Sequence, residues 1–265
     1  MTDRLFPLKG RRAFVCGSTQ GIGRACAVEF ARLGASVTLL ARHEEALELV
    51  RESLARDAGQ THDSIRVDFA DWEAVRGAAM EHVHETGPAQ ILLNNTGGPA
   101  PGSAFEAQPE EYVKALNQHI LCNQVLVQAL AGGMRDAGYG RIINIISTSV
   151  VMPIKGLGVS NTIRAAVANW ARTLAAELGP FGITVNNILP GFTATARLDS
   201  LIKGRASRAG VSAAEIEMDM KATIPARRFG TAEEIAAVAG FLASPAAAYV
   251  NGVNLPVDGG RLAAQ

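Results

Sequence analysis

Short apolar runs alternate with helical patterns along nearly the whole chain. The runs have the length of strands, several are apolar without alternation, and they occupy residues 11–17, 35–41, 64–69, 89–95, 140–147, 182–190 and 253–260. Helical patterns lie between them and begin near Ile22, Glu44, Asp71, Pro109, Ser160 and Ala232. Strands without alternation are typical of a parallel sheet that helices cover on both faces. The sequence therefore predicts a single doubly wound α/β domain with a seven-stranded, mainly parallel sheet.

Residues 193–230 break this alternation. The segment is rich in Arg, Lys, Ala and Ser and carries only weak helical periodicity. A long insertion after the carboxyl end of a strand, where sheets of this kind bind ligands, is a candidate substrate lid. Its basic residues outnumber its acidic ones, which either favours an acidic substrate, such as a phosphopantetheine-linked acyl group, or reflects a solvated surface.

The first junction between a strand and a helix reads "CGSTQGIGRA". Gly17, Gly21 and Gly23 allow a tight backbone turn that comes close to a ligand. Free N–H groups at the start of the following helix, together with the helix dipole, suit a pyrophosphate. The alternative is a glycine-rich turn that only packs the helix on the strand.

Further motifs occur in an order that resembles the short-chain dehydrogenase/reductase family. They are the three-residue gap between the first two glycines, "NNTG", "GRIINIIS", "LPGFTAT", "RRFGTAEEIAAVAGFLAS" and "VNGVNLPVDGG". The resemblance covers residues 8–260, and overall the motifs are most similar to those of 3-oxoacyl-acyl-carrier-protein reductases. It implies a Rossmann-type dinucleotide-binding domain over residues 1–265. Cys16 and Thr96 depart from the family pattern, where Thr and Ala are usual.

The resemblance also implies a nicotinamide cofactor. The second strand ends with Ala41 and Arg42 instead of an acidic residue, and a guanidinium group is a good partner for a 2′-phosphate. We therefore expect NADP(H) in preference to NAD(H), although Arg42 is also compatible with a solvated residue at a helix start. The cofactor-binding residues implied are Gly17, Ser18, Thr19, Gly21, Ile22, Gly23, Arg42, Asp68, Asn95, Gly97, Arg164, Pro190, Gly191 and Thr195.

The family reduces carbonyl groups with a Tyr that donates a proton, a Lys that lowers the pKa of that Tyr, and a Ser that polarises the carbonyl. Carried onto this chain, the Ser is Ser147, whereas Ser160 stands at the Tyr position and Arg164 at the Lys position. A serine hydroxyl is a much weaker acid than a phenol. An arginine stays protonated, so it supplies charge and hydrogen bonds without passing on a proton.

The family also holds a water molecule with an Asn on the preceding long helix. That position falls on His119, although a small shift in the alignment would place it on Asn117 or Asn123. Because imidazole titrates near neutral pH, His119 is a candidate proton donor. Two alternatives remain open: a hydrogen-bonded structural histidine at this position, and water as the donor.

Composition and charge narrow the function classes. The chain has 265 residues, of which 25 are basic and 25 acidic, so nothing global points to nucleic acid or to an anionic membrane. The three cysteines have no metal-ligand spacing, and buried reduced thiols favour the cytosol. The first twelve residues contain no apolar stretch of signal-peptide length. The resemblance further implies a homotetramer built through two long helices and the carboxyl-terminal strand.

Two functions from different classes fit these observations. The favoured one is a cytosolic NADP(H)-dependent oxidoreductase that acts on a carbonyl/alcohol pair, in the manner of a 3-oxoacyl-thioester reductase, with an altered catalytic set. The other is a catalytically silent NADP(H)-binding sensor or partner subunit, because the Tyr and the Lys are replaced together whereas the glycine loop is kept.

Overall fold

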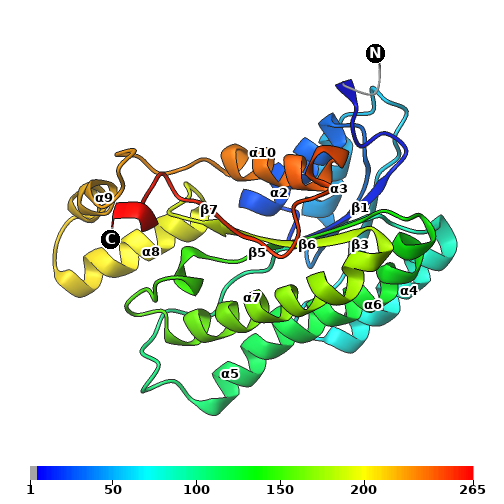
Figure 1. Cartoon of the computed structure of the whole chain (residues 1–265). Coiled ribbons are helices and arrows are strands. Elements are labelled where there is room, and N and C mark those ends of the chain that lie inside the picture. Colours follow the sequence, from blue (N-terminus) through cyan, green and yellow to red (C-terminus); the bar gives the residue numbers. More distant parts are fainter. Residues whose placement is uncertain (1–4, 265) are drawn as a thin grey trace.

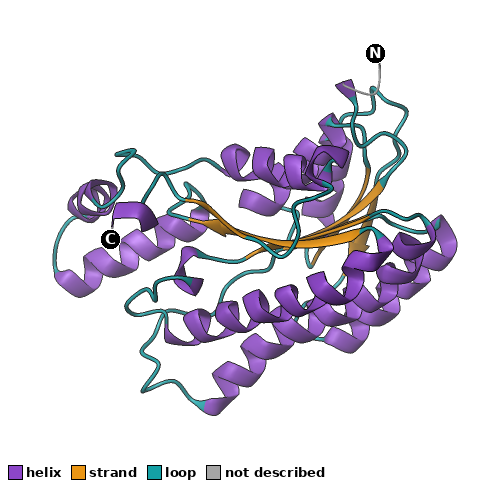
Figure 2. Cartoon of the chain, viewed as in Figure 1, coloured by secondary structure: helices purple, strands orange, loops and turns teal. Residues whose placement is uncertain are grey.

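The computed structural model describes residues 5–264 and contains one parallel sheet of seven strands (Figure 2). The strand order is β3-β2-β1-β4-β5-β6-β7, and every strand pairs parallel to its neighbours. This confirms the doubly wound α/β class. The bounds are β1 (Arg12–Cys16), β2 (Ser36–Ala41), β3 (Asp63–Arg66), β4 (Ile91–Asn94), β5 (Gly140–Ile145), β6 (Ile183–Pro190) and β7 (Asn254–Val257).

Helices cover both faces of the sheet (Figure 1). One face carries α2 (Gly21–Arg32), α3 (Glu44–Ser53) and α10 (Ala232–Ala243). The opposite face carries α4 (Trp72–Thr86), α5 (Pro109–Leu116), α6 (Cys122–Asp136) and α7 (Gly158–Leu178). A short π-helical stretch, η1 (Asn117–Leu121), joins α5 to α6, and single 3-10 turns lie at η2 (Thr148–Val150), η3 (Gly179–Phe181), η4 (Pro245–Ala247) and η5 (Leu262–Ala264). No helix within the described residues has the length and apolar character to cross a membrane.

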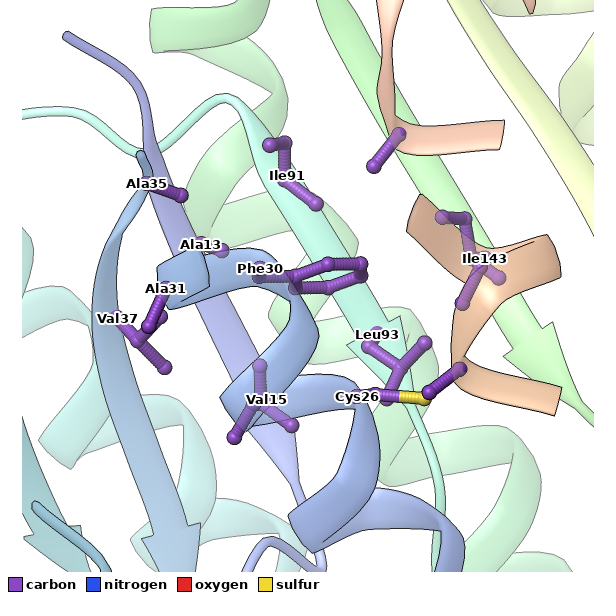
Figure 3. Packing of buried hydrophobic residues seen from close by; sticks show 14 of the residues in the cluster. Ala13, Val15, Cys26, Phe30, Ala31, Ala35, Val37, Ile91, Leu93 and Ile143 are labelled. Carbon is purple, nitrogen blue, oxygen red and sulfur yellow. The ribbon is translucent and has the colours of Figure 1, made fainter. Parts of the chain in front are cut away.

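Two hydrophobic clusters hold these layers together, one on each face of the sheet. Strand side chains alternate between them: Ala13 and Val15 of β1 pack beneath α2, whereas Phe14 and Cys16 point to the other face. Phe30 of α2 is fully buried and lies over β1, β4 and β5 (Figure 3). Because both faces are covered, the strands are apolar at successive positions, and this explains the unbroken runs in the sequence.

A ladder of four asparagines crosses four neighbouring strands of the sheet. Asn94, Asn144, Asn187 and Asn254 stand opposite one another on β4 to β7. Their side-chain amides bond in series, with distances of 2.8, 2.9 and 2.8 Å from one strand to the next. Buried amides are stabilised by such bonds, so the ladder helps to specify the register of these four strands, although the side-chain oxygen of Asn94 is buried without a partner among the described residues.

The predicted insertion forms a pair of helices beyond the carboxyl edge of the sheet, α8 (Ala196–Ala209) and α9 (Ala213–Ala222) (Figure 1). Its two ends meet at a parallel bridge between Thr193 and Gly230, the two residues that bound the predicted segment. The helices share a small core of their own, which contains Leu198, Ile202 and Met220.

Candidate functional site

A cleft of about 1440 Å³ lies at the carboxyl edge of the sheet, where the junctions after β1, β2, β4, β5 and β6 meet the start of α8. This is the edge at which doubly wound sheets bind ligands. The structure brings together in its lining most of the site residues that the sequence predicts: Gly17, Thr19, Gly21, Ile22, Arg42, Asp68, Asn95, Gly97, Ser147, Ser160, Arg164, Pro190, Gly191 and Thr195. Of the predicted set, Ser18, Gly23 and His119 do not line it.

The glycine corner between β1 and α2 leaves no space for side chains. Gly17 and Gly21 have φ angles of +59° and +52°, a backbone conformation that favours glycine. A Cβ atom on Gly23 would lie 2.1 Å from the carbonyl oxygen of Gly17. Asn95 braces the same turn, since its amide nitrogen donates to the carbonyl oxygens of Cys16 and Gly17 at 3.3 and 3.4 Å. The corner therefore presents closely packed backbone to the cleft.

The start of α2 is open to an anion. Its N-cap residue, Gln20, makes no side-chain hydrogen bond to the first turn, and that turn contains no acidic residue. Backbone N–H groups at the positive end of the helix dipole are thus left for a ligand. Ser18 is fully buried and lies 3.5 Å from the carbonyl oxygen of Leu40, so its side chain supports the turn and does not reach the cleft.

Next to the glycine corner, the end of β2 carries an exposed ion pair. Arg42 follows β2, and its guanidinium lies 3.9 Å from the carboxylate of Asp68, with both side chains more than half exposed. Asp68 also accepts a hydrogen bond from the backbone N–H of Ala70 at 3.0 Å. Such a loose pair leaves donors of Arg42 available to a phosphate group.

Two hydroxyl groups face the middle of the cleft from different elements. Ser147 follows β5, and its oxygen accepts the backbone N–H of Ser149 at 3.0 Å, which leaves its own O–H proton free to donate. Ser160 lies in the first turn of α7, and Arg164 follows one turn later on the same face. Ser147, Ser160 and Arg164 all line the same cleft.

Arg164 reaches across to the end of β5, where one of its terminal nitrogens donates to the carbonyl oxygen of Ile145 at 2.7 Å. Burial, and then the positive charge of Arg197, lower the pKa of Arg164 to about 10, so the group remains a cation at neutral pH. Arg197 comes from α8 and donates to the carbonyl oxygens of Gly98 and Pro99 at 3.2 and 2.7 Å. Arg197 is one of the basic residues of the insertion at 193–230, and no motif in the sequence distinguishes it from the others.

His119 lies outside the cleft, in the π-helical stretch between α5 and α6, and is 3% exposed. Its Nδ1 atom is hydrogen-bonded to the hydroxyl of Thr96 at 2.7 Å. Burial, reinforced by the nearby Arg164, lowers the pKa of His119 to about 3, so the ring is neutral at neutral pH. The ring is thus hydrogen-bonded at Nδ1, whereas its Nε2 atom is buried without a hydrogen-bond partner in the part of the chain that the structure describes. Its neighbour Gln118 lines the cleft instead.

The cleft contains no phenol. All three tyrosines lie within the described residues, and none of them is in its lining. The hydroxyl of Tyr112 donates to the carbonyl oxygen of Ala104, Tyr139 packs at the other end of the sheet, and Tyr249 is fully exposed. The described residues also hold no group of three acidic, His or Cys side chains arranged to bind a metal ion.

Comparisons with known proteins give a consistent result. A family described as enoyl-(acyl carrier protein) reductase matches residues 17–261. The 3-oxoacyl-[acyl-carrier-protein] reductase FabG of Pseudomonas aeruginosa is 35% identical over 256 residues, which cover 96% of this chain and 98% of that protein. The NADPH-dependent reductase BacG of Bacillus subtilis is 30% identical over 253 residues, or 95% of this chain and 98% of BacG. L-sorbose reductase from Gluconobacter frateurii, solved with NADPH and L-sorbose, superimposes with a TM-score of 0.90 at 31% identity and covers 97% of this chain and 98% of that chain.

Proposed function

This chain belongs to the short-chain dehydrogenase/reductase family, and from that premise we propose that it is an NADP(H)-dependent oxidoreductase acting on a carbonyl/alcohol pair. One observation carries the proposal: the glycine corner, the exposed Arg42 and the free hydroxyl of Ser147 line one cleft. The names of the relatives support NADPH as the cofactor, since BacG is an NADPH-dependent reductase and the sorbose reductase holds NADPH. FabG makes a 3-oxoacyl thioester one candidate substrate.

The residues of the cleft fit such a cofactor. The positive φ angles of Gly17 and Gly21 and the uncapped start of α2 suit a pyrophosphate, and a Cβ atom on Gly17 would meet the backbone oxygen of Asn95 at 2.5 Å. Arg42 is proposed to bind the 2′-phosphate, Asp68 the adenine amino group, and Asn95 the adenosine ribose. Gly97, Pro190, Gly191 and Thr195 are proposed to border the nicotinamide. When bound, NADPH supplies the hydride for reduction of a carbonyl.

The catalytic groups are proposed to be Ser147, Ser160 and Arg164, with the last two at the positions of the family's Tyr and Lys. Ser147 donates its free O–H proton in a hydrogen bond to the carbonyl oxygen, with Ser160 as a second donor beside it. The guanidinium of Arg164 stabilises negative charge on that oxygen and stays protonated at neutral pH. Since His119 is buried and neutral, a water molecule is the proposed source of the proton.

A slow enzyme follows from this set. A positioned general acid contributes roughly 10²–10⁴-fold to a rate, and neither serine nor arginine replaces a phenol in that role. The test is consumption of NADPH with a panel of ketones and 3-oxoacyl thioesters. Ser147→Ala should reduce turnover and leave NADPH affinity unchanged. Ser53→Ala is the matched control, because its hydroxyl bonds to Val50 on α3, outside the cleft.

A second candidate is a catalytically silent NADP(H)-binding sensor or partner subunit. The absence of any tyrosine from the lining of the cleft favours it. This candidate predicts tight NADPH binding without turnover, in the wild type and in Ser147→Ala alike. The double variant Ser160→Tyr/Arg164→Lys separates the two further, because a gain of ordinary ketone reduction would indicate that the cleft still accepts a carbonyl compound.

A further inference from the structure

Two arginines from different elements converge beside Ser147. Arg164 belongs to α7 and Arg197 to α8, and both line the cleft. One terminal nitrogen of each lies close to a single point, the position of a Cβ atom on Gly98, at 3.4 Å for Arg164 and 3.3 Å for Arg197. Because Arg164 also bonds to Ile145, two residues before Ser147, the pair sits next to the proposed reacting carbonyl.

This pair of cations has no anionic partner among the described residues. The side-chain hydrogen bonds of Arg164 and Arg197 all go to backbone carbonyl oxygens, which accept hydrogen bonds but do not neutralise charge. Four acidic residues line the cleft, and none of them pairs with these arginines. Asp68 faces Arg42, Glu29 pairs with Arg32, Glu111 caps α5 through the backbone N–H of Gln108 at 2.9 Å, and Glu233 lies in the first turn of α10. Two like charges held together in a partly buried site disfavour each other, so an added anion would stabilise both.

We propose that the substrate is an acidic carbonyl compound whose oxyanion group, a carboxylate or a phosphate, is bound jointly by Arg164 and Arg197. The inference rests on the proposed function and names the substrate class for the same site. Guanidinium groups bind both oxyanions through paired, charge-assisted hydrogen bonds, which are stronger than bonds to neutral carbonyl oxygens. Upon binding, the anion would replace Gly98 and Pro99 as the acceptor for Arg197.

The cofactor also carries phosphate groups, but other parts of the cleft are proposed to bind them. The uncapped start of α2 suits the pyrophosphate, and Arg42 follows β2, next to the glycine corner. The arginine pair instead borders the end of β5 and the loop after β4. Since Arg197 belongs to the inserted helices, its bond to a substrate anion would also couple the insertion to substrate binding.

The experiment compares acids with matched neutral compounds on protein saturated with NADP⁺, so that no ketone is turned over. The pairs are acetoacetate with methyl acetoacetate, and dihydroxyacetone phosphate with dihydroxyacetone. Calorimetry gives each Kd for the wild type and for Arg197→Gln. Arg208→Gln is the matched control, because Arg208 lies on the same helix and outside the lining of the cleft. Thermal melts check that both variants fold.

At least one acid should bind the wild type about tenfold more tightly than its neutral partner. The pair with the larger ratio of the two Kd values identifies the preferred group as carboxylate or phosphate. Arg197→Gln should weaken that acid about ten- to a hundredfold, as expected for lost hydrogen bonds to a charged group, and should change the neutral compound and NADP⁺ by less than about threefold. Arg208→Gln should leave the Kd of the acid, of the neutral compound and of NADP⁺ unchanged.

Three results would overturn the inference while the proposed function stands: acids that bind no better than neutral partners, acid binding that is insensitive to Arg197→Gln, or NADP⁺ affinity that falls in Arg197→Gln. The last would assign the arginine to the cofactor. Failure of NADP⁺ and NADPH to bind the wild type would instead refute the proposed function itself, and the inference with it.

Discussion

Replacement of Gly23 by alanine should damage the cofactor site through a defined collision. The new Cβ atom would lie 2.1 Å from the carbonyl oxygen of Gly17 and 2.6 Å from the amide nitrogen of Asn95. Neither neighbour can easily yield, since Gly17 already has a positive φ angle and Asn95 bonds to the same turn. Overpacking of this kind costs roughly 1–3 kcal/mol. The higher helix propensity of alanine offsets up to about 1 kcal/mol of that loss in the free energy of unfolding.

The collision displaces the backbone that faces the proposed pyrophosphate, so NADPH affinity should fall about 5- to 150-fold, the equivalent of 1–3 kcal/mol. Calorimetric titration with NADPH and urea unfolding measure the two effects. Gly77→Ala is the matched control: Gly77 lies in α4 with no atom within 4 Å of its Cβ position, so it should gain roughly 0.5–1 kcal/mol of stability and keep its NADPH affinity. A Gly23→Ala protein with wild-type affinity and stability would refute this reasoning.

Three further predictions address other parts of the account. Arg42→Ala should raise the Kd of NADPH about tenfold and leave that of NADH unchanged, whereas Arg66→Ala, an exposed arginine outside the cleft, should alter neither. Burial lowers the pKa of His119 from 6.5 to about 3, so as the pH drops through this range the unfolded chain binds the proton before the folded chain does. The free energy of unfolding of the wild type should therefore fall. Between pH 6.5 and 4.5, His119→Asn should lose about 2–3 kcal/mol less of its free energy of unfolding than the wild type, as measured by urea titration. Asn144→Ala should reduce the free energy of unfolding by about 2–4 kcal/mol, since it leaves an amide unpaired on each neighbouring strand.

The sequence was sufficient to predict the fold and the place of the cleft. Apolar runs without alternation marked the strands, and the glycine pattern after the first run marked the corner at Gly17 and Gly21. These features are local, because each depends on residues that are neighbours in the chain. The break in alternation over residues 193–230 is also local, whereas the bridge that joins Thr193 to Gly230 is a contact between distant positions.

Features that depend on distant contacts were not predictable. Arg197 donates to a carbonyl 99 positions away in the chain, and its distance from Arg164 depends on how α8 lies over the sheet. The asparagine ladder requires the register of four strands, which no single run contains. The burial of His119 depends on the π-helical turn and on Thr96, and the Thr at that position, where Ala is usual, is the one clue that the sequence offers.

We propose that this cleft reduces a carbonyl with NADPH through serine hydroxyls and a guanidinium group, without a phenol. Single-turnover oxidation of NADPH bound to the wild-type protein, mixed with an excess of acidic and neutral ketones, measures this most directly. The account predicts slow loss of the NADPH absorbance with at least one acidic ketone, further slowed in Ser147→Ala and unchanged in Ser53→Ala. Bound NADPH that stays reduced in the presence of every ketone would contradict the account and favour a binding protein without catalysis.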